Sequence, residues 1–113
     1  MKNIIAVLAM TFIGFSVQAQ EVKNKNTKVE FHVSGNCEMC KKRIEKGALS
    51  VSGVKSADWH MDCGTLYLIV NEQKTNVVTI QNAIAKAGHD AGEAKALKED
   101  YDKLHTCCQY ERK

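Results

Sequence analysis

Residues 28–54, KVEFHVSGNCEMCKKRIEKGALSVSGV, contain the change of pattern that decides the fold. Over 29–33, apolar and polar residues alternate, and this period of two predicts a half-buried strand. After a break at Gly35 the period becomes helical, and the apolar face of the predicted helix carries Cys40, Ile44, Ala48 and Val51. Gly53 predicts the end of that helix. The stretch therefore predicts a strand, a turn and a helix, with two cysteines where the helix begins.

The residues that follow predict the rest of a small α+β domain. Residues 54–61 and 65–70 predict two more strands, joined by a turn at Asp62-Cys63-Gly64. Asn76 is a suitable N-cap for a second helix that ends at Gly88, with an apolar stripe of Ile80, Ala83, Ile84 and Ala87. A weak extended segment follows over 91–96. This order predicts a ferredoxin-like βαββαβ sandwich, an antiparallel sheet with two helices on one face.

The remaining segments are assigned by their composition. We expect a flexible lead-in over 20–27, the domain over 28–96 and a tail over 97–113. In the tail, Leu97, Tyr101 and Leu104 have the spacing of a short helix that can dock on the domain. The sequence His105-Thr106-Cys107-Cys108 follows this helix. The fold prediction is therefore a ferredoxin-like domain with a short helical, cysteine-rich C-terminal tail.

Residues 1–19, MKNIIAVLAMTFIGFSVQA, have the layout of a secretory signal peptide. Lys2 supplies a basic start, an apolar run extends from Ile4 to Val17, and small residues up to Ala19 suit cleavage. The run is shorter than the about 20 apolar residues that span a bilayer. We therefore expect an exported protein, periplasmic or otherwise extracytoplasmic, without stable membrane insertion after cleavage and in an oxidising environment.

Composition and motifs exclude several classes of function. Sixteen Lys and Arg against thirteen Asp and Glu give a net charge of +3, which is too mild for a nucleic-acid binder. The sequence has no P-loop, no Gly-x-Ser-x-Gly and no recognisable catalytic pair of carboxylates, so we expect no enzyme. Its unusual feature is five cysteines, an odd number that a disulfide framework cannot use completely.

Cys37-Glu38-Met39-Cys40 places two thiols at the expected junction of strand and helix. Two thiolates at this spacing can bind one ion, and the partial positive charge of the helix N-terminus lowers their pKa. Soft thiolates favour ions such as Cu(I) and Zn(II) over Mg(II) and Ca(II). The same spacing also suits a redox dithiol or a structural disulfide, so the motif alone leaves three interpretations open.

Residues 28–90 resemble the heavy-metal-associated domain of copper chaperones, metal-pumping P-type ATPases and periplasmic mercury-binding proteins. The resemblance rests on KVEFHVSG, CEMCKKRIEKGALSVSGV and IQNAIAKAGHD, and it implies that Cys37 and Cys40 bind the metal ion. The loop Gly35-Asn36-Cys37 is one residue shorter than the family's usual Gly-Met-x-Cys and lacks the methionine. His89 stands where bacterial relatives often have an aromatic residue, in a loop beside the site. It is a candidate third ligand or outer donor, although we expect an ordinary exposed loop histidine.

The tail carries a second group of metal-binding side chains. His105, Cys107 and Cys108 place three soft or borderline donors within four residues, and a disulfide between adjacent cysteines would be strained. The tail can complete the Cys37/Cys40 site or bind a separate ion. Alternatively, it forms a disulfide to Cys63 or to another chain. We favour metal binding and leave Cys63 outside the primary site.

The resulting hypothesis is a non-enzymatic, exported metal-binding protein, either a copper chaperone or a heavy-metal scavenger. It would hold Cu(I) first of all, or Zn(II), Hg(II) or Cd(II), and pass the ion by ligand exchange to a metal-transporting membrane protein or another metal-accepting protein. One rival is a thiol–disulfide oxidoreductase of thioredoxin type, although such enzymes use a cis-proline and this chain has no proline. The other rival is an interaction domain stabilised by a Cys37–Cys40 disulfide.

Overall fold

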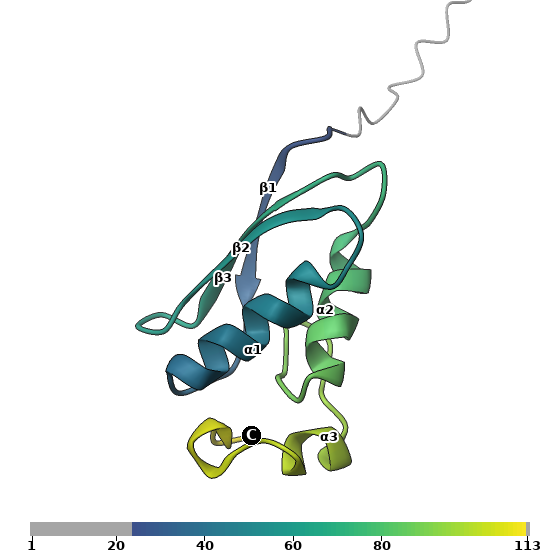
Figure 1. Cartoon of the computed structure of the whole chain (residues 1–113). Helices are drawn as coiled ribbons and strands as arrows, with labels where there is room; N and C mark the ends of the chain where they lie inside the picture. The colour runs from purple at the N-terminus through teal and green to yellow at the C-terminus, as the bar shows by residue number, and fades with distance from the viewer. Residues whose placement is uncertain (1–23, 113) are drawn as a thin grey trace, which may run out of the picture.

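The computed structural model describes residues 24–112, so the predicted signal peptide lies outside the described residues. The elements are β1 (Thr27–His32), α1 (Glu38–Leu49), β2 (Val54–His60), β3 (Thr65–Val70), α2 (Val77–Lys86), α3 (Lys98–Asp102) and the short 3-10 helix η1 (Thr106–Cys108). A layer of two helices lies against a sheet, and the tail with α3 crosses one end of the domain (Figure 1). The ferredoxin-like arrangement predicted from the sequence is therefore confirmed.

β3 is the central strand of an antiparallel sheet with the order β1-β3-β2. Thr65 of β3 pairs with His32 of β1 on one side and with His60 of β2 on the other. Alternation along β3 buries one face of the strand, whose buried residues are Leu66, Leu68 and Val70. The sheet thus presents one apolar face to the helices.

The weak strand expected over 91–96 is not formed in the part of the chain that the structure describes. The segment makes only isolated bridges, between Val33 and Ala91 and between Ala91 and Ala94. It folds back on itself because Gly92 has a φ of 53° and the Ala94 N–H donates to the Ala91 carbonyl. The sheet of the described residues therefore has three strands.

The apolar face predicted for the first helix forms the centre of the core. Cys40, Ile44 and Ala48 of α1 are fully buried, and α1 packs against both β2 and α2. Trp59 of β2 is the largest of the fully buried side chains. Cys40 therefore belongs to the core as well as to the cysteine motif, which ties the motif to the packing of the helix.

α2 begins and ends at the residues that the sequence predicts. The Asn76 side chain accepts a hydrogen bond of 2.9 Å from the Thr79 N–H, which satisfies one of the free donors of the first turn. Gly88 has a φ of 107°, a conformation that residues with a Cβ avoid. The chain turns there and continues toward the tail.

The tail packs on the end of the domain that contains the start of α1 and the end of α2 (Figure 1). Leu104 is buried and Tyr101 is half-buried, as their helical spacing predicts, but Leu97 is 62% exposed. The expectation for Leu97 is wrong because α3 begins only after it, with Leu97 as the extended N-cap residue. Among residues 24–112, no helix is both long enough and apolar enough to cross a membrane.

Two glycine substitutions test this account of the fold. An alanine Cβ at Gly88 would lie 2.8 Å from Leu104 Cδ2 and 2.9 Å from the Asp100 carbonyl, at a strained φ, so Gly88→Ala should lower the free energy of unfolding by about 1–3 kcal/mol. At Gly47 in α1 the nearest atoms are 3.6 Å away, so Gly47→Ala should raise it by about 0.5–1 kcal/mol. Urea unfolding measures both changes, and equal effects would contradict the assignment.

Candidate metal centre

Two cysteines of the site are positioned by the start of α1. Cys37 is the N-cap residue, with an extended backbone (φ −147°, ψ 178°). The first helical hydrogen bond runs from the Lys41 N–H to the Cys37 carbonyl. Cys40 lies in the first turn and is fully buried, whereas Cys37 is half-buried. One thiol therefore faces the core and the other lies at the surface.

The tail brings two more thiols to this pair. The Cys37 Sγ atom lies 3.5 Å from that of Cys40, 3.4 Å from that of Cys107 and 3.5 Å from that of Cys108. The Sγ atoms of Cys37, Cys40 and Cys108 all lie within 4.8 Å of one another. Three free thiols from two segments about 70 residues apart can therefore approach one ion.

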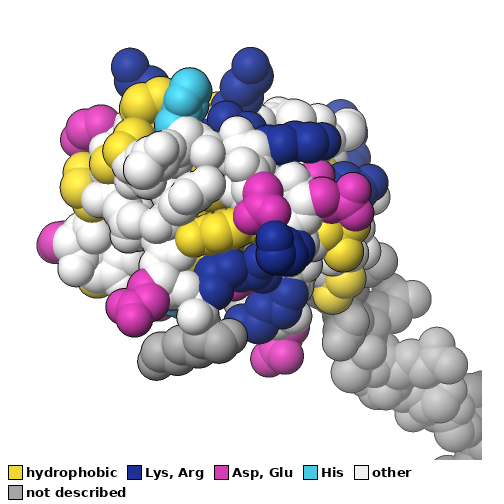
Figure 2. Space-filling model, turned by 90° about the horizontal axis from the view of Figure 1, so that it is seen from below, with side chains coloured by type: hydrophobic (Ala, Val, Ile, Leu, Met, Phe, Trp, Pro, Cys, Tyr) yellow, Lys and Arg dark blue, Asp and Glu magenta, His cyan; other side chains and the backbone are white. Residues whose placement is uncertain are grey.

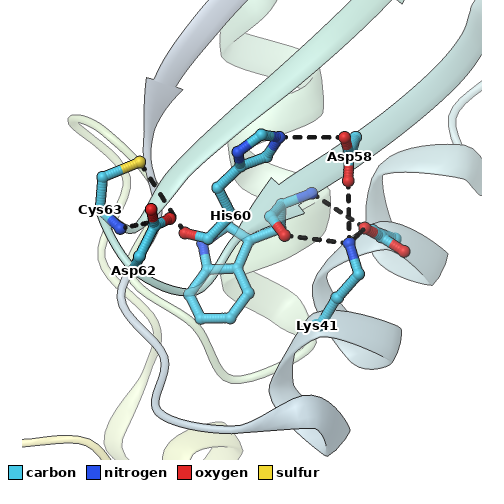
Figure 3. Close-up of polar contacts among 7 residues, drawn as sticks. Lys41, Asp58, His60, Asp62 and Cys63 are labelled. Carbon is cyan, nitrogen blue, oxygen red and sulfur yellow. Dashed lines mark hydrogen bonds and ion pairs between the residues drawn. The ribbon is translucent and has the colours of Figure 1, made fainter.

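The other predicted candidates lie outside this three-thiol group. His105 is exposed and stands just before η1. Cys63 is exposed in the turn after β2, where its Sγ contacts the His60 carbonyl at 4.0 Å and its N–H donates to Asp62 (Figure 3). Cys63 therefore lies at the junction of β2 and β3, outside the group formed by Cys37, Cys40 and Cys108.

His89 is buried, and the expectation of an exposed loop histidine is wrong. Its ring stacks on Tyr110 of the tail, with centroids 5.6 Å apart and an interplanar angle of 23°. Its Nδ1 lies 2.8 Å from the Ser34 carbonyl, which can only accept, so the proton is on Nδ1. Burial lowers the pKa of His89, which keeps the ring neutral. His89 thus holds the backbone of the loop before Cys37 and is not part of the sulfur group.

The hydrogen bonds around Cys37 make it the thiolate of the group. Loss of hydration opposes ionisation, but hydrogen bonds from the Cys40 N–H and from the neighbouring thiols outweigh it and lower the pKa of Cys37 to about 7. The hydrogen bond to Cys37 raises the pKa of Cys107, and burial raises that of Cys108. Cys37 is therefore partly ionised near neutral pH, with the sulfur atoms of Cys40, Cys107 and Cys108 in contact with it.

A group of charged residues joins α1 to β2 beside the site. Lys41 Nζ donates to Glu45 at 2.6 Å and to Asp58 at 2.9 Å, and His60 contacts the other oxygen of Asp58 at 3.0 Å (Figure 3). Glu45 also accepts a hydrogen bond from the Trp59 N–H. The hydrogen bonds to Asp58 and Glu45 raise the pKa of Lys41. Lys41 thus connects α1 to β2 through Glu45 and Asp58.

The residues that anchor the tail were not predicted from the sequence. The Tyr110 hydroxyl accepts a hydrogen bond of 2.8 Å from the Asp90 N–H and donates one of 3.0 Å to the Gly88 carbonyl. Arg112 pairs with the Asp90 carboxylate at 2.9 Å and lies over the Tyr101 ring. The only sequence signal was an aromatic and a basic residue shortly after the cysteine pair. We call this group, Asp90, Tyr101, Tyr110 and Arg112, the tail anchor.

We expect Cys37 to be the most reactive thiol of the metal-free protein. Its pKa of about 7 supplies thiolate, the nucleophilic form, at neutral pH. In pulse alkylation with iodoacetamide over a pH series, read by peptide mass spectrometry, the Cys37 rate should reach half its maximum near pH 7. Buried Cys108 should stay unmodified. Exposed Cys63 is the control, and a Cys37 rate at neutral pH no greater than that of Cys63 would contradict the prediction.

Comparisons with known proteins identify the family of the fold. The profile of the heavy-metal-associated domain matches residues 30–90, which confirms the resemblance seen in the sequence. The structure is similar to that of the CopZ metallochaperone, with 27% identity, a TM-score of 0.56, and coverage of 57% of this chain and 98% of that one. The search of curated proteins found no match.

Two further solved structures extend the comparison. One is the N-terminal domain of a potential copper-translocating P-type ATPase from Bacillus subtilis in the Cu(I)-loaded state, with 28% identity, a TM-score of 0.56, and coverage of 59% of this chain and 85% of that one. The other is oxidized MerP from Ralstonia metallidurans CH34, with 25% identity, a TM-score of 0.57, and coverage of 59% and 94%. The family profile ends at residue 90, so the C-terminal tail lies outside the part of the chain that it matches.

Proposed function

This chain belongs to the heavy-metal-associated domain family, and we propose that it binds a soft metal ion through Cys37 and Cys40 and passes it to another protein. The observation that carries the proposal is the group of sulfur atoms at the start of α1, all within 4.8 Å of one another. Thiolate sulfur is a soft ligand, which favours soft and borderline ions. A half-buried Cys37 beside a fully buried Cys40 keeps the ion near the surface, where a partner can reach it.

Cu(I) is the ion that we propose first, with Zn(II), Hg(II) and Cd(II) behind it. The sulfur-only character of the group supports Cu(I). Two of the similar structures are named as a metallochaperone and as a Cu(I)-loaded domain of a copper-translocating ATPase. On this evidence we prefer non-enzymatic binding and transfer to thiol–disulfide exchange.

Transfer would proceed by exchange of thiolate ligands. The Cys37 thiolate is the more accessible ligand, and it would bind the ion before the buried Cys40 closes the site. On release, a thiolate of the partner would displace the accessible Cys37 first and the buried Cys40 last. We propose a metal-transporting membrane protein or another metal-accepting protein as this partner. The face at the tail end carries both Lys or Arg and Asp or Glu side chains, which suits docking to a partner of mixed charge (Figure 2).

Loss of the two motif cysteines tests the proposed function. In competition with a Cu(I) chelator, Cys37→Ser/Cys40→Ser should bind Cu(I) at least about 100-fold more weakly than the parent, because a hydroxyl is a poor ligand for a soft ion. Cys63→Ser is the matched control and should bind like the parent, since Cys63 is exposed and outside the sulfur group. Unchanged affinity of the double variant would refute the proposal.

We also propose that the protein acts outside the cytoplasm, after removal of residues 1–19. The support is the basic start and apolar run of this segment. N-terminal sequencing of the protein from an extracytoplasmic fraction should find Gln20 first. Leu8→Arg places a charge in the apolar run and should leave the precursor uncleaved, whereas Leu8→Ile should be processed normally. Recovery of the mature protein in the cytoplasm alone would contradict this localisation.

A further inference from the structure

The spacing of the sulfur atoms differs from that of a linear two-thiolate site. With a metal–sulfur bond of about 2.3 Å, two thiolates in line across an ion lie about 4.6 Å apart, whereas those of a trigonal or tetrahedral site lie about 3.8–4.0 Å apart. The Cys37 Sγ is 3.5 Å from both the Cys40 and the Cys108 Sγ. Both distances are closer to the spacing of a site with three or four thiolates.

The tail cysteines point at the pair in a way that packing alone does not explain. Cys108 is 1% exposed and could serve as a small apolar side chain in the core. Cys107 is exposed, however, and its Sγ lies 3.4 Å from Cys37 and 3.6 Å from the Met39 Sδ. Two adjacent residues, one buried and one exposed, thus direct sulfur toward the same thiolate.

The tail anchor positions the Cys107 and Cys108 sulfur atoms through hydrogen bonds and an ion pair in which no sulfur atom takes part. Tyr110 is 3% exposed, and its hydroxyl bridges the Asp90 N–H and the Gly88 carbonyl. Arg112 donates to the Asp90 carboxylate and also to the Ala96 carbonyl at 2.7 Å. Buried, satisfied hydrogen bonds of this kind specify a single arrangement. Cys108, two residues before Tyr110, is therefore held at the motif before any ion arrives.

We propose that the tail completes the metal site, with Cys108 as a third thiolate beside Cys37 and Cys40, and with Cys107 as an outer sulfur at the exposed rim. This inference rests on the proposed function and adds a ligand that the Cys-x-x-Cys motif does not contain. The site would take a thiophilic ion in three-coordinate form. It would also hold that ion more tightly than two thiolates can.

Binding of the ion at this site releases protons from the thiols and involves no electron transfer. Three metal–sulfur bonds form, the remaining thiol protons pass to water, and the previous ligands of the ion leave. Release to a partner reverses these steps, and each incoming thiolate replaces one sulfur of the chain. The ion departs fully only when the Cys108 bond breaks, so movement of the tail controls release.

The coordination number of bound Cu(I) tests this directly. X-ray absorption of the Cu(I)-loaded protein should find three sulfur ligands in the parent and in Cys107→Ser, and two in Cys108→Ser. In chelator competition, Cys108→Ser should bind Cu(I) at least about tenfold more weakly, while Cys107→Ser should keep most of the affinity. Two sulfur ligands in the parent would overturn the inference without any variant, even if Cys108→Ser failed to fold.

A second variant leaves every sulfur in place and loosens the tail. Tyr110→Phe removes the hydroxyl that bridges Asp90 and Gly88, so transfer of Cu(I) to a chelator should be several-fold faster. Tyr67→Phe, at an exposed position of β3, is the matched control and should leave the rate unchanged. Equal rates for both variants would count against control by the tail.

The outcomes separate this inference from the proposed function. If Cys108→Ser keeps full affinity while Cys37→Ser/Cys40→Ser loses it, the tail cysteine is not a ligand and the two-cysteine proposal stands. If Cys37→Ser/Cys40→Ser binds like the parent, the proposed function itself fails.

Discussion

The position of residues 34–36, which lead to Cys37 and which we call the metal loop, depends on the packing of Trp59 against the first turns of α1. Trp59 is 1% exposed, and its Nε1 donates to the Val33 carbonyl at 3.1 Å. A Cβ at Gly35 would come within 3.1 Å of the Trp59 ring and 3.0 Å of the Cys40 Cβ, so the loop is closely packed against the ring. Replacing a buried Trp by Ala typically costs about 3–5 kcal/mol. The buried Trp59 side chain, which contributes much to the core, therefore also fixes the position of the metal loop.

The sulfur group combines this rigid loop with a tail that is held separately. Cys40 and Cys108 are both buried in the core, and the tail is also held by hydrogen bonds of the Tyr110 hydroxyl with the Asp90 N–H and the Gly88 carbonyl. His89 connects the two parts, since it stacks on Tyr110 and hydrogen-bonds the Ser34 carbonyl. A change in the position of the tail can therefore shift the metal loop through the His89 ring. This arrangement suits a site that must hold an ion and also release it.

Most of the fold could be predicted because its signals are local. The period-two pattern of β1, the helical face of Cys40, Ile44 and Ala48, and the caps at Asn76 and Gly88 are each contained within a few residues. The expected strand over 91–96 failed because extended residues become a strand only when a partner strand accepts them. There the chain turned at Gly92, and Val33 was left with one isolated bridge.

The cysteine motif at a helix start and its preference for soft ions could be predicted from the amino-acid sequence, because both follow from residue type and short spacing. The 3.5 Å distance between the Cys108 and Cys37 sulfur atoms and the stacking of buried His89 on Tyr110 arise only in the folded chain. These contacts join segments about 70 and about 20 residues apart. Closing such loops costs entropy that no local pattern reveals, and here the buried hydrogen bonds and the ion pair of the tail anchor offset that cost.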